Sequence, residues 1–242
     1  MAHFYLNEFL GSAAVGDRVA VEGKEARHAV TVSRLSVGES VSIGNGAGLV
    51  ATGEVVDATH ERLEIEVARV QDVPQPSPAI FLAQALAKGD RDEFAVQTAT
   101  ELGVDGVIPW MAGRSISRWE GAKVAKGHAR WSAVAREATK QSMRAWIPDV
   151  LDMVTSRQLA KLGEGARLLV LEPTADVALT DVDLDERDLV VVVGPEGGIT
   201  EAELDLFAAA GATAVRLGGN VLRTSTAGPA AIAVLSAKLG RW

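Results

Sequence analysis

The chain of 242 residues has no cysteine, which excludes a disulfide scaffold, a thiolate nucleophile and a zinc–thiolate site. Its histidines are too scattered to indicate a metal motif, and they stand at His3, His28, His60 and His128. No GxGxxG sequence follows an early strand, which disfavours a Rossmann-type site, and no GxxxxGKS/T sequence is present. The chain is therefore neither a disulfide-stapled protein nor a P-loop hydrolase.

Long apolar runs are also absent. No run reaches the length of a membrane span, and the start, MAHFYLNEFL, lacks the basic region and apolar core of a signal peptide. We therefore expect a cytoplasmic protein without a membrane partner.

The net charge of −8 argues against a generic nucleic-acid binder, but residues 114–144 hold eight basic side chains against only Glu120 and Glu137. This local excess is either a solvated face or a nucleic-acid contact, and the residues alone leave both open.

The first 73 residues have the composition of a small β domain. Strands are predicted at 18–21, 40–43, 48–55 and 62–70, with a short helix over 25–35. Asn45-Gly46 between two of these strands is typical of a hairpin turn. Residues 74–78 contain three prolines, so they predict a stiff linker between domain 1–73 and domain 79–242.

Domain 79–242 alternates strands with helices, which predicts an α/β fold with a mainly parallel sheet. The expected strands are 79–85, 106–110, 167–171, 189–193 and 214–217. The expected helices include 92–102 and 126–145, and in the latter Arg136, Lys140 and Arg144 are spaced to form one basic ridge.

Two of these strands run into glycine-rich loops that each lead into a helix. Residues 194–198 read GPEGG, and Thr200 and Glu203 have the spacing of a capping box for the helix that follows. The second loop follows Gly218, and we expect a side chain among residues 224–226 to cap the last helix, with Pro229 in its first turn. Because ligands of open α/β sheets bind at the carboxyl ends of strands, the loops predict a binding site.

The sequence motifs of these two loops are distinctive enough to indicate a family. GPEGGIT followed by LGGNVLRTSTA, together with an upstream KGD and ATELGV, resembles the bacterial 16S ribosomal RNA (uracil-N3) methyltransferases of the SPOUT superfamily. The chain departs from this family at Asn220 and Ser225, where Arg and Glu are common. Lys140 and Met143 likewise replace a common Glu and Gly.

The resemblance implies a C-terminal SPOUT trefoil-knot domain preceded by a small PUA-like, RNA-binding β-barrel. It also implies a homodimer that uses S-adenosyl-L-methionine to methylate N3 of a uridine in 16S rRNA, within the small ribosomal subunit. Two alternatives remain open at this point. One is a knotted methyltransferase for another RNA position, and the other is an inactive ribosome-assembly factor that binds RNA.

The resemblance also assigns roles to residues of this chain. Those expected to bind the methyl donor are Leu171, Glu172, Gly194, Pro195, Glu196, Gly197, Leu217, Gly218, Leu222, Arg223 and Thr224. Arg223 is the candidate catalytic residue, because a guanidinium stabilises negative charge that develops on a uracil oxygen. Glu196 is either a proton acceptor or a group that holds the turn together. The candidates for RNA contact are Arg34, Lys88, Arg91, Arg114, Arg136, Lys140 and Arg144.

Overall fold

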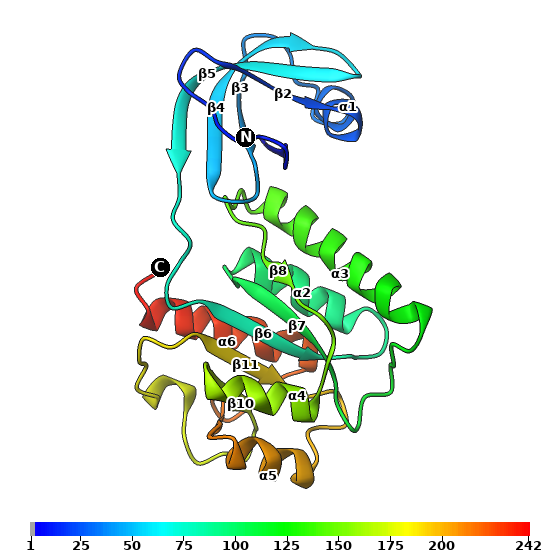
Figure 1. Cartoon of the computed structure of the whole chain (residues 1–242), viewed down its shortest axis with the longest axis vertical. Coiled ribbons are helices and arrows are strands. Elements are labelled where there is room, and N and C mark those ends of the chain that lie inside the picture. The colour runs from blue at the N-terminus through cyan, green and yellow to red at the C-terminus, as the bar shows by residue number, and fades with distance from the viewer. Residues whose placement is uncertain (1–2) are drawn as a thin grey trace. The chain divides into compact units, whose positions relative to one another are not determined.

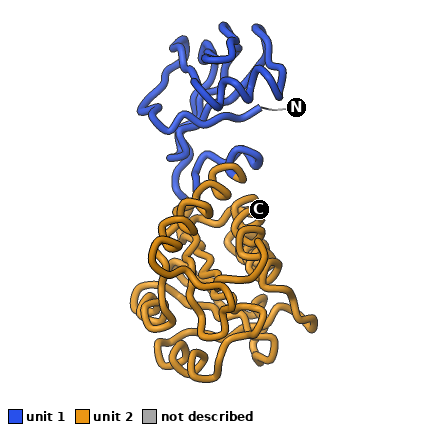
Figure 2. Tube along the Cα trace, turned by 90° about the vertical axis from the view of Figure 1, so that its right-hand side faces the viewer, with its two compact units in different colours: residues 1–75, 139–147 blue, residues 76–138, 148–242 orange. Residues whose placement is uncertain are grey.

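The structure, a computed structural model that describes residues 3–242, divides into two compact units (Figures 1 and 2). Unit 1 comprises the residues up to Gln75 together with Thr139–Ile147, and unit 2 comprises Pro76–Ala138 and Pro148–Trp242. The second domain was expected to run unbroken from residue 79. Packing instead assigns the short segment 139–147 to unit 1.

Hydrogen bonds explain why this segment belongs to unit 1. The long helix α3 (Ala122–Gln141) ends before the expected position at residue 145, because Met143 adopts a left-handed φ of 54° that a helix cannot continue. The chain then runs beside a hairpin of unit 1. There, Gly48 N donates to Ala145 O at 3.0 Å and Ile147 N donates to Gly46 O at 2.9 Å.

Unit 1 is a five-stranded sheet in the order β1-β3-β4-β5-β2, with one parallel pair, β1 and β3. Its elements are β1 (Phe4–Leu6), β2 (Arg18–Glu22), α1 (Gly23–Thr31), β3 (Ser40–Gly44), β4 (Leu49–Ala58) and β5 (Arg62–Asp72). The Asn45-Gly46 hairpin is confirmed: Gly46 has φ 73°, and the Asn45 side chain accepts from Leu49 N at 3.0 Å. Strand β1 was not predicted, because three residues are too few to show a pattern.

Unit 2 is built on one parallel sheet in the order β12-β10-β11-β6-β7-β8, with β9 also paired to β7. Its strands are β6 (Ile80–Ala85), β7 (Gly106–Met111), β8 (Asp149–Val150), β9 (Val154–Thr155), β10 (Arg167–Leu171), β11 (Leu189–Val193) and β12 (Thr213–Val215). The expected α/β fold with a mainly parallel sheet is confirmed. Strands β10 and β11 match their predicted bounds, because both are runs of apolar residues buried on two faces.

Helices cover both faces of this sheet (Figure 1). Along β11, Val191 and Val193 belong to the apolar core beneath α2 (Arg91–Glu101), α3 and α6 (Thr224–Lys238), while Val190 and Val192 belong to the core beneath α4 (Ser156–Lys161) and α5 (Glu201–Ala209). Two short 3₁₀ turns, Leu162–Glu164 and Leu179–Asp181, complete the unit. The last helix follows the edge strand β12 and packs against β11 and β6 in the middle of the sheet.

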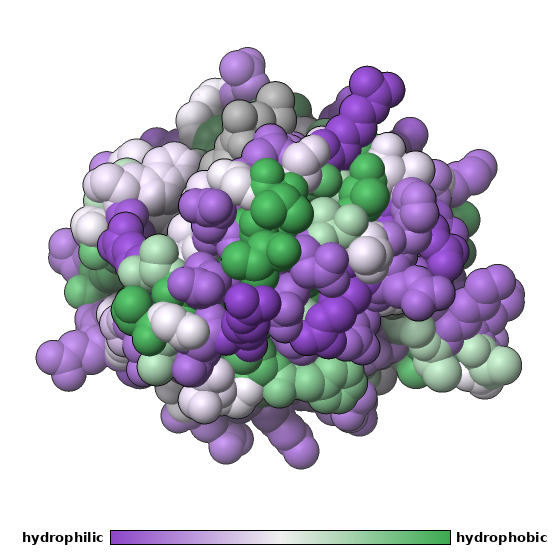
Figure 3. Space-filling model, turned by 90° about the horizontal axis from the view of Figure 1, so that it is seen from above, coloured by the Kyte–Doolittle hydropathy of each residue, from purple (hydrophilic) through white to green (hydrophobic). Residues whose placement is uncertain are grey.

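On the face drawn in Figure 3, apolar side chains stand in small groups among hydrophilic ones. Over the described residues, the large apolar side chains exposed by more than 60% include Phe9, Val15, Ile116 and Val221. None of the helices in residues 3–242 is long and apolar enough to cross a membrane.

Candidate functional site: a cavity at the carboxyl ends of three strands

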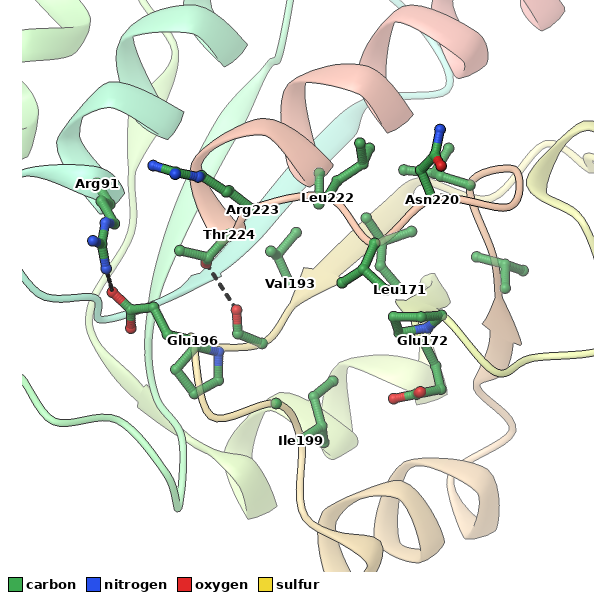
Figure 4. A pocket seen from close by; sticks show the side chains of 18 residues that line it. Arg91, Leu171, Glu172, Val193, Glu196, Ile199, Asn220, Leu222, Arg223 and Thr224 are labelled. Carbon is green, nitrogen blue, oxygen red and sulfur yellow. Dashed lines mark hydrogen bonds and ion pairs between the residues drawn. The ribbon is translucent and has the colours of Figure 1, made fainter.

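A cavity of about 370 Å³ lies in unit 2 where β10, β11 and β12 end (Figure 4). Three loops line it: Leu171–Pro173 after β10, Gly194–Ile199 after β11, and Leu217–Arg223 before α6. Parallel strands bring their carboxyl ends to one edge of a sheet, so segments far apart in sequence meet here. The volume lies in the usual range for a small-molecule site.

The glycine loop after β11 needs a residue without a side chain at its first position. A Cβ on Gly194 would lie 2.7 Å from Ile199 Cγ1, closer than atoms can pack. The loop closes as a turn in which Gly198 N donates to Pro195 O at 2.8 Å. Gly194, Pro195 and Gly198 of this loop line the cavity together with apolar side chains such as Leu171, and a flat apolar ring with a polar edge, such as adenine, fits this combination. These residues fit the methyl donor that the resemblance implies.

The start of α6 differs from expectation. Its N-cap is Arg223, without a side-chain cap, and the Thr224 hydroxyl donates to Gly194 O at 2.8 Å instead of capping the helix. The prediction of a cap among residues 224–226 is therefore wrong. Pro229 is the sixth residue of the helix, beyond the expected first turn, because the helix begins at the buried Thr224. In Figure 4 Arg223 lies with Arg91 at one end of the cavity, and Glu172 lies at the other.

Glu196 is held by the loop that precedes α2. Its Oε1 accepts from Arg91 Nη1 at 2.7 Å and from Lys88 N at 3.2 Å. Burial alone would raise the pKa of Glu196, but hydrogen bonds from its own backbone N–H, Arg91 and Lys88 outweigh burial and lower this pKa. A carboxylate with a lowered pKa is a weak proton acceptor, so this arrangement favours a role in holding the turn.

Behind the glycine loop, Glu203 joins three segments of unit 2. The predicted capping box is confirmed, since Glu203 Oε2 accepts from Thr200 N at 3.1 Å and from Thr200 Oγ1 at 2.7 Å. Its Oε1 also accepts from Gly113 N at 2.8 Å and from Ser156 Oγ at 2.7 Å. The neighbouring Arg114 donates to Gly197 O at 3.0 Å. The loop after β7 is thus bonded both to the start of α5 and to the glycine loop.

Most of the expected donor-binding residues meet at the cavity. Nine of the eleven line it, and the two that do not are Gly197, which contacts Arg114, and Gly218, which lines a neighbouring hollow. The lining residues that were not expected to bind the donor are Arg91, which was a candidate for RNA contact, and Pro173, Val193, Gly198, Ile199, Val215, Asn220, Val221 and Ala227. Apart from Arg91, all of them lie within three residues of an expected donor-binding residue in the sequence, which is a signal that could have found them.

The candidate RNA-contact residues fall into separate groups. Arg91 and Arg114 are bonded around the glycine loop, and the exposed Lys88 stands beside them. In unit 1, Arg34 is exposed, and Lys140 forms an ion pair with Glu25 at 3.0 Å.

The prediction of one basic ridge formed by Arg136, Lys140 and Arg144 is wrong for Arg144. Arg136 and Lys140 belong to α3, but Arg144 lies after its end at Gln141, so the three do not continue one helical face. The cause is the left-handed turn at Met143, where the resembled family commonly has glycine.

Comparisons with known proteins agree with this architecture. A family model described as "RNA methyltransferase domain" matches residues 74–236, and one described as "RNA methyltransferase PUA domain" matches residues 21–68. Ribosomal RNA small subunit methyltransferase E from Mycobacterium bovis is 40% identical to this chain, covering 99% of it and 92% of that protein. The protein of the same name from Bacillus subtilis is 30% identical, covering 90% of this chain and 89% of that protein.

A solved structure extends the likeness to three dimensions. The crystal structure of a ribosomal RNA small subunit methyltransferase E from Neisseria gonorrhoeae, bound to S-adenosyl methionine, matches with a TM-score of 0.87. The two chains are 30% identical, and 98% of each is covered. The expected PUA-like first domain and SPOUT second domain are confirmed. The chain therefore belongs to the RNA methyltransferase family that includes ribosomal RNA small subunit methyltransferase E.

Proposed function

We propose that this protein is an S-adenosyl-L-methionine-dependent methyltransferase that modifies N3 of a uridine in 16S rRNA. One observation carries the proposal: three loops at the carboxyl ends of β10, β11 and β12 line one cavity, to which the glycine loop and several apolar side chains contribute. Such a rRNA substrate also implies that the enzyme works in the cytoplasm.

The donor, when bound, supplies an electrophilic methyl group, and its sulfur leaves with the bonding electron pair as S-adenosylhomocysteine. Leu171, Leu217 and Leu222 line the cavity and would pack on the adenine, while the backbone of the 194–198 loop would bond to its polar edge. The protein must also accept the N3 proton or pass it to water. The fold contributes to the reaction by holding the methyl donor and the uridine in a fixed orientation within this cavity.

Arg223 is the residue of this chain best placed to act on the uracil. It lines the cavity, is exposed, and stands at the N-terminal end of α6, where the helix dipole adds further positive potential. As the N3 proton leaves, negative charge develops on the uracil oxygens. We assign Arg223 to stabilise that charge, because a preorganised cation acts most strongly at the transition state.

We propose that RNA is recognised through local basic faces and shape, because the net charge of −8 opposes bulk attraction. Lys88, Arg91 and Arg114 surround the glycine loop and would position the phosphates beside the target base. The target base must leave its stack to enter the cavity. An assembled small subunit would hold that RNA in one shape, so we propose it as the substrate.

A homodimer also belongs to the proposal. Val221, in the loop before α6, is 79% exposed, and the neighbouring hollow is lined by apolar side chains that include Leu217, Leu222 and Val234. An exposed apolar side chain beside an apolar hollow is a feature that association would bury. Light scattering after gel filtration should give about twice the monomer mass of 25.4 kDa, and Val221→Asp should shift it toward the monomer.

The proposed activity is tested by methyl transfer from labelled donor to small ribosomal subunits that lack native modification, followed by mass spectrometry of the nucleosides. N3-methyluridine is the expected product. A different methylated nucleoside would keep the donor site and move the protein to another RNA position. Absence of both transfer and donor binding would favour an assembly factor, the alternative toward which the departures at Asn220, which lines the cavity, and at the buried Ser225 point.

A further inference from the structure

A buried chain of hydrogen bonds links three elements around the donor cavity. Gln84, near the end of β6, is fully buried, and its Nε2 donates to Thr224 Oγ1 at 2.8 Å. Thr224, the first residue of α6, is 7% exposed and donates to Gly194 O at 2.8 Å. The ends of β6 and β11 and the start of α6 are thereby held together.

The direction of these bonds is determined by the threonine hydroxyl. A hydroxyl has one proton, and here the Gly194 carbonyl accepts it. Thr224 Oγ1 therefore meets Gln84 only as an acceptor, so the glutamine amide must be the donor. The peptide between Gly194 and Pro195 is oriented as a result, and both residues line the donor cavity. Thr224 has no proton left with which to bind a ligand.

The carbonyl oxygen of the Gln84 side chain, unlike its NH₂ group, takes no part in this chain of hydrogen bonds. Among the residues that the structure describes, Gln84 Oε1 is buried without a hydrogen-bond partner. A buried acceptor left unpaired destabilises the folded state, and an apolar side chain of similar length would avoid that penalty. Packing of the sheet therefore does not explain a glutamine in the otherwise apolar strand IFLAQA.

We infer that Gln84 is a positioning residue for the methyl-donor site, acting through Thr224 on the Gly194–Pro195 peptide. This inference rests on the proposed function, because it takes the cavity to be the donor site. Gln84 does not line the cavity, so its effect must pass through the two residues that do.

The test measures donor binding by calorimetry and the melting temperature without donor, on the full chain. Gln84→Met should bind S-adenosylmethionine about tenfold more weakly, the equivalent of one hydrogen bond, with an unchanged or higher melting temperature. Thr224→Val should weaken binding at least as much, whereas Thr224→Ser should retain it. Gln97→Met, at an exposed glutamine bonded to Glu101, is the matched control and should leave binding unchanged.

The double variant, Gln84→Met with Thr224→Val, separates positioning from a general structural role. If Gln84 acts through Thr224, the double variant binds no more weakly than Thr224→Val alone. Wild-type affinity in Gln84→Met, or additive losses accompanied by a lower melting temperature, would overturn the inference.

If the wild-type protein binds no donor, the proposed function is refuted. The effect of Gln84 on the glycine loop can then still be measured without a ligand. Hydrogen exchange at Gly198 N, which is bonded to Pro195 O, reports on the glycine loop without any ligand. Faster exchange at this amide in Gln84→Met would support the inference, and equal exchange would refute it.

Discussion

Replacing Glu203 with glutamine should destabilise the protein at neutral pH by about 2.5–4 kcal/mol. The carboxylate accepts two bonds at each oxygen, from Gly113 and Ser156 at one and from Thr200 at the other. Glutamine keeps one acceptor oxygen but turns an NH₂ group toward donors. Loss of a capping interaction costs about 1 kcal/mol, and loss of hydrogen bonds to a charged acceptor costs about 1.5–3 kcal/mol.

This destabilisation should depend on pH. Burial would raise the pKa of Glu203, but hydrogen bonds from Ser156, Gly113 and Thr200 outweigh burial and bring its pKa below 4.5, the value of an unperturbed glutamate. A carboxyl group with a lowered pKa in the folded state stabilises the protein above its unfolded pKa. That contribution is lost as the pH falls through the folded pKa. The deficit of Glu203→Gln should therefore shrink below pH 4.5.

Urea unfolding followed by tryptophan fluorescence measures the deficit at neutral and at acidic pH. The control is Gln158→Ala, which removes the side-chain half of the capping box at the start of α4, the bonds that Gln158 Oε1 accepts from Thr155 N at 2.9 Å and Thr155 Oγ1 at 2.8 Å. Its acceptor is a neutral amide, so its smaller deficit should not change with pH. Equal stability of Glu203→Gln and wild type at neutral pH, or a deficit that persists unchanged in acid, would refute the reasoning.

Three further predictions concern the cavity and the end of the chain. Gly194→Ala places a Cβ 2.7 Å from Ile199 Cγ1, so it should weaken donor binding about tenfold or more, and calorimetry showing wild-type affinity would contradict this. Arg223→Ala should lower kcat about 10²–10³-fold in the methyl-transfer assay, and unimpaired turnover would remove Arg223 from the catalytic role. Arg241→Ala leaves the buried Asp105 carboxylate without its ion pair at 2.9 Å, so urea unfolding should show a loss of about 3 kcal/mol, and an unchanged midpoint would argue against it.

The cavity was predictable because its residues lie in short, distinctive stretches. The apolar runs that became β10 and β11 are buried on both faces, and such runs cannot form a half-exposed strand. Glycines after a strand and a capping box before a helix then indicated loops with free backbone groups. Each of these sequence patterns lies within a few residues of the strand, loop or helix start that it predicts, so no information about distant parts of the chain was needed.

Other features depended on partners far away in sequence. The two-residue strands β8 and β9 exist only because β7 lies beside them. Helix α3 ends at Gln141, before the left-handed turn at Met143, and the segment 145–147 that follows bonds to the hairpin at 46–48, a partner about 100 positions away. The role of Gln84 was missed for the same reason, since its partner Thr224 is 140 positions away, although a lone polar residue in an apolar strand was a signal.

The sequence by itself determined most of the longer strands and helices, the mainly parallel character of the second sheet and the glycine loops that follow its strands. These properties follow from periodicity, capping and turn chemistry, which act over a few residues. Only the tertiary structure decided that the Thr224 hydroxyl bonds to Gly194 instead of capping α6, and that Glu196 is held by Arg91. A side chain with several possible partners takes the one that folding brings within hydrogen-bond distance, and that choice depends on the whole chain.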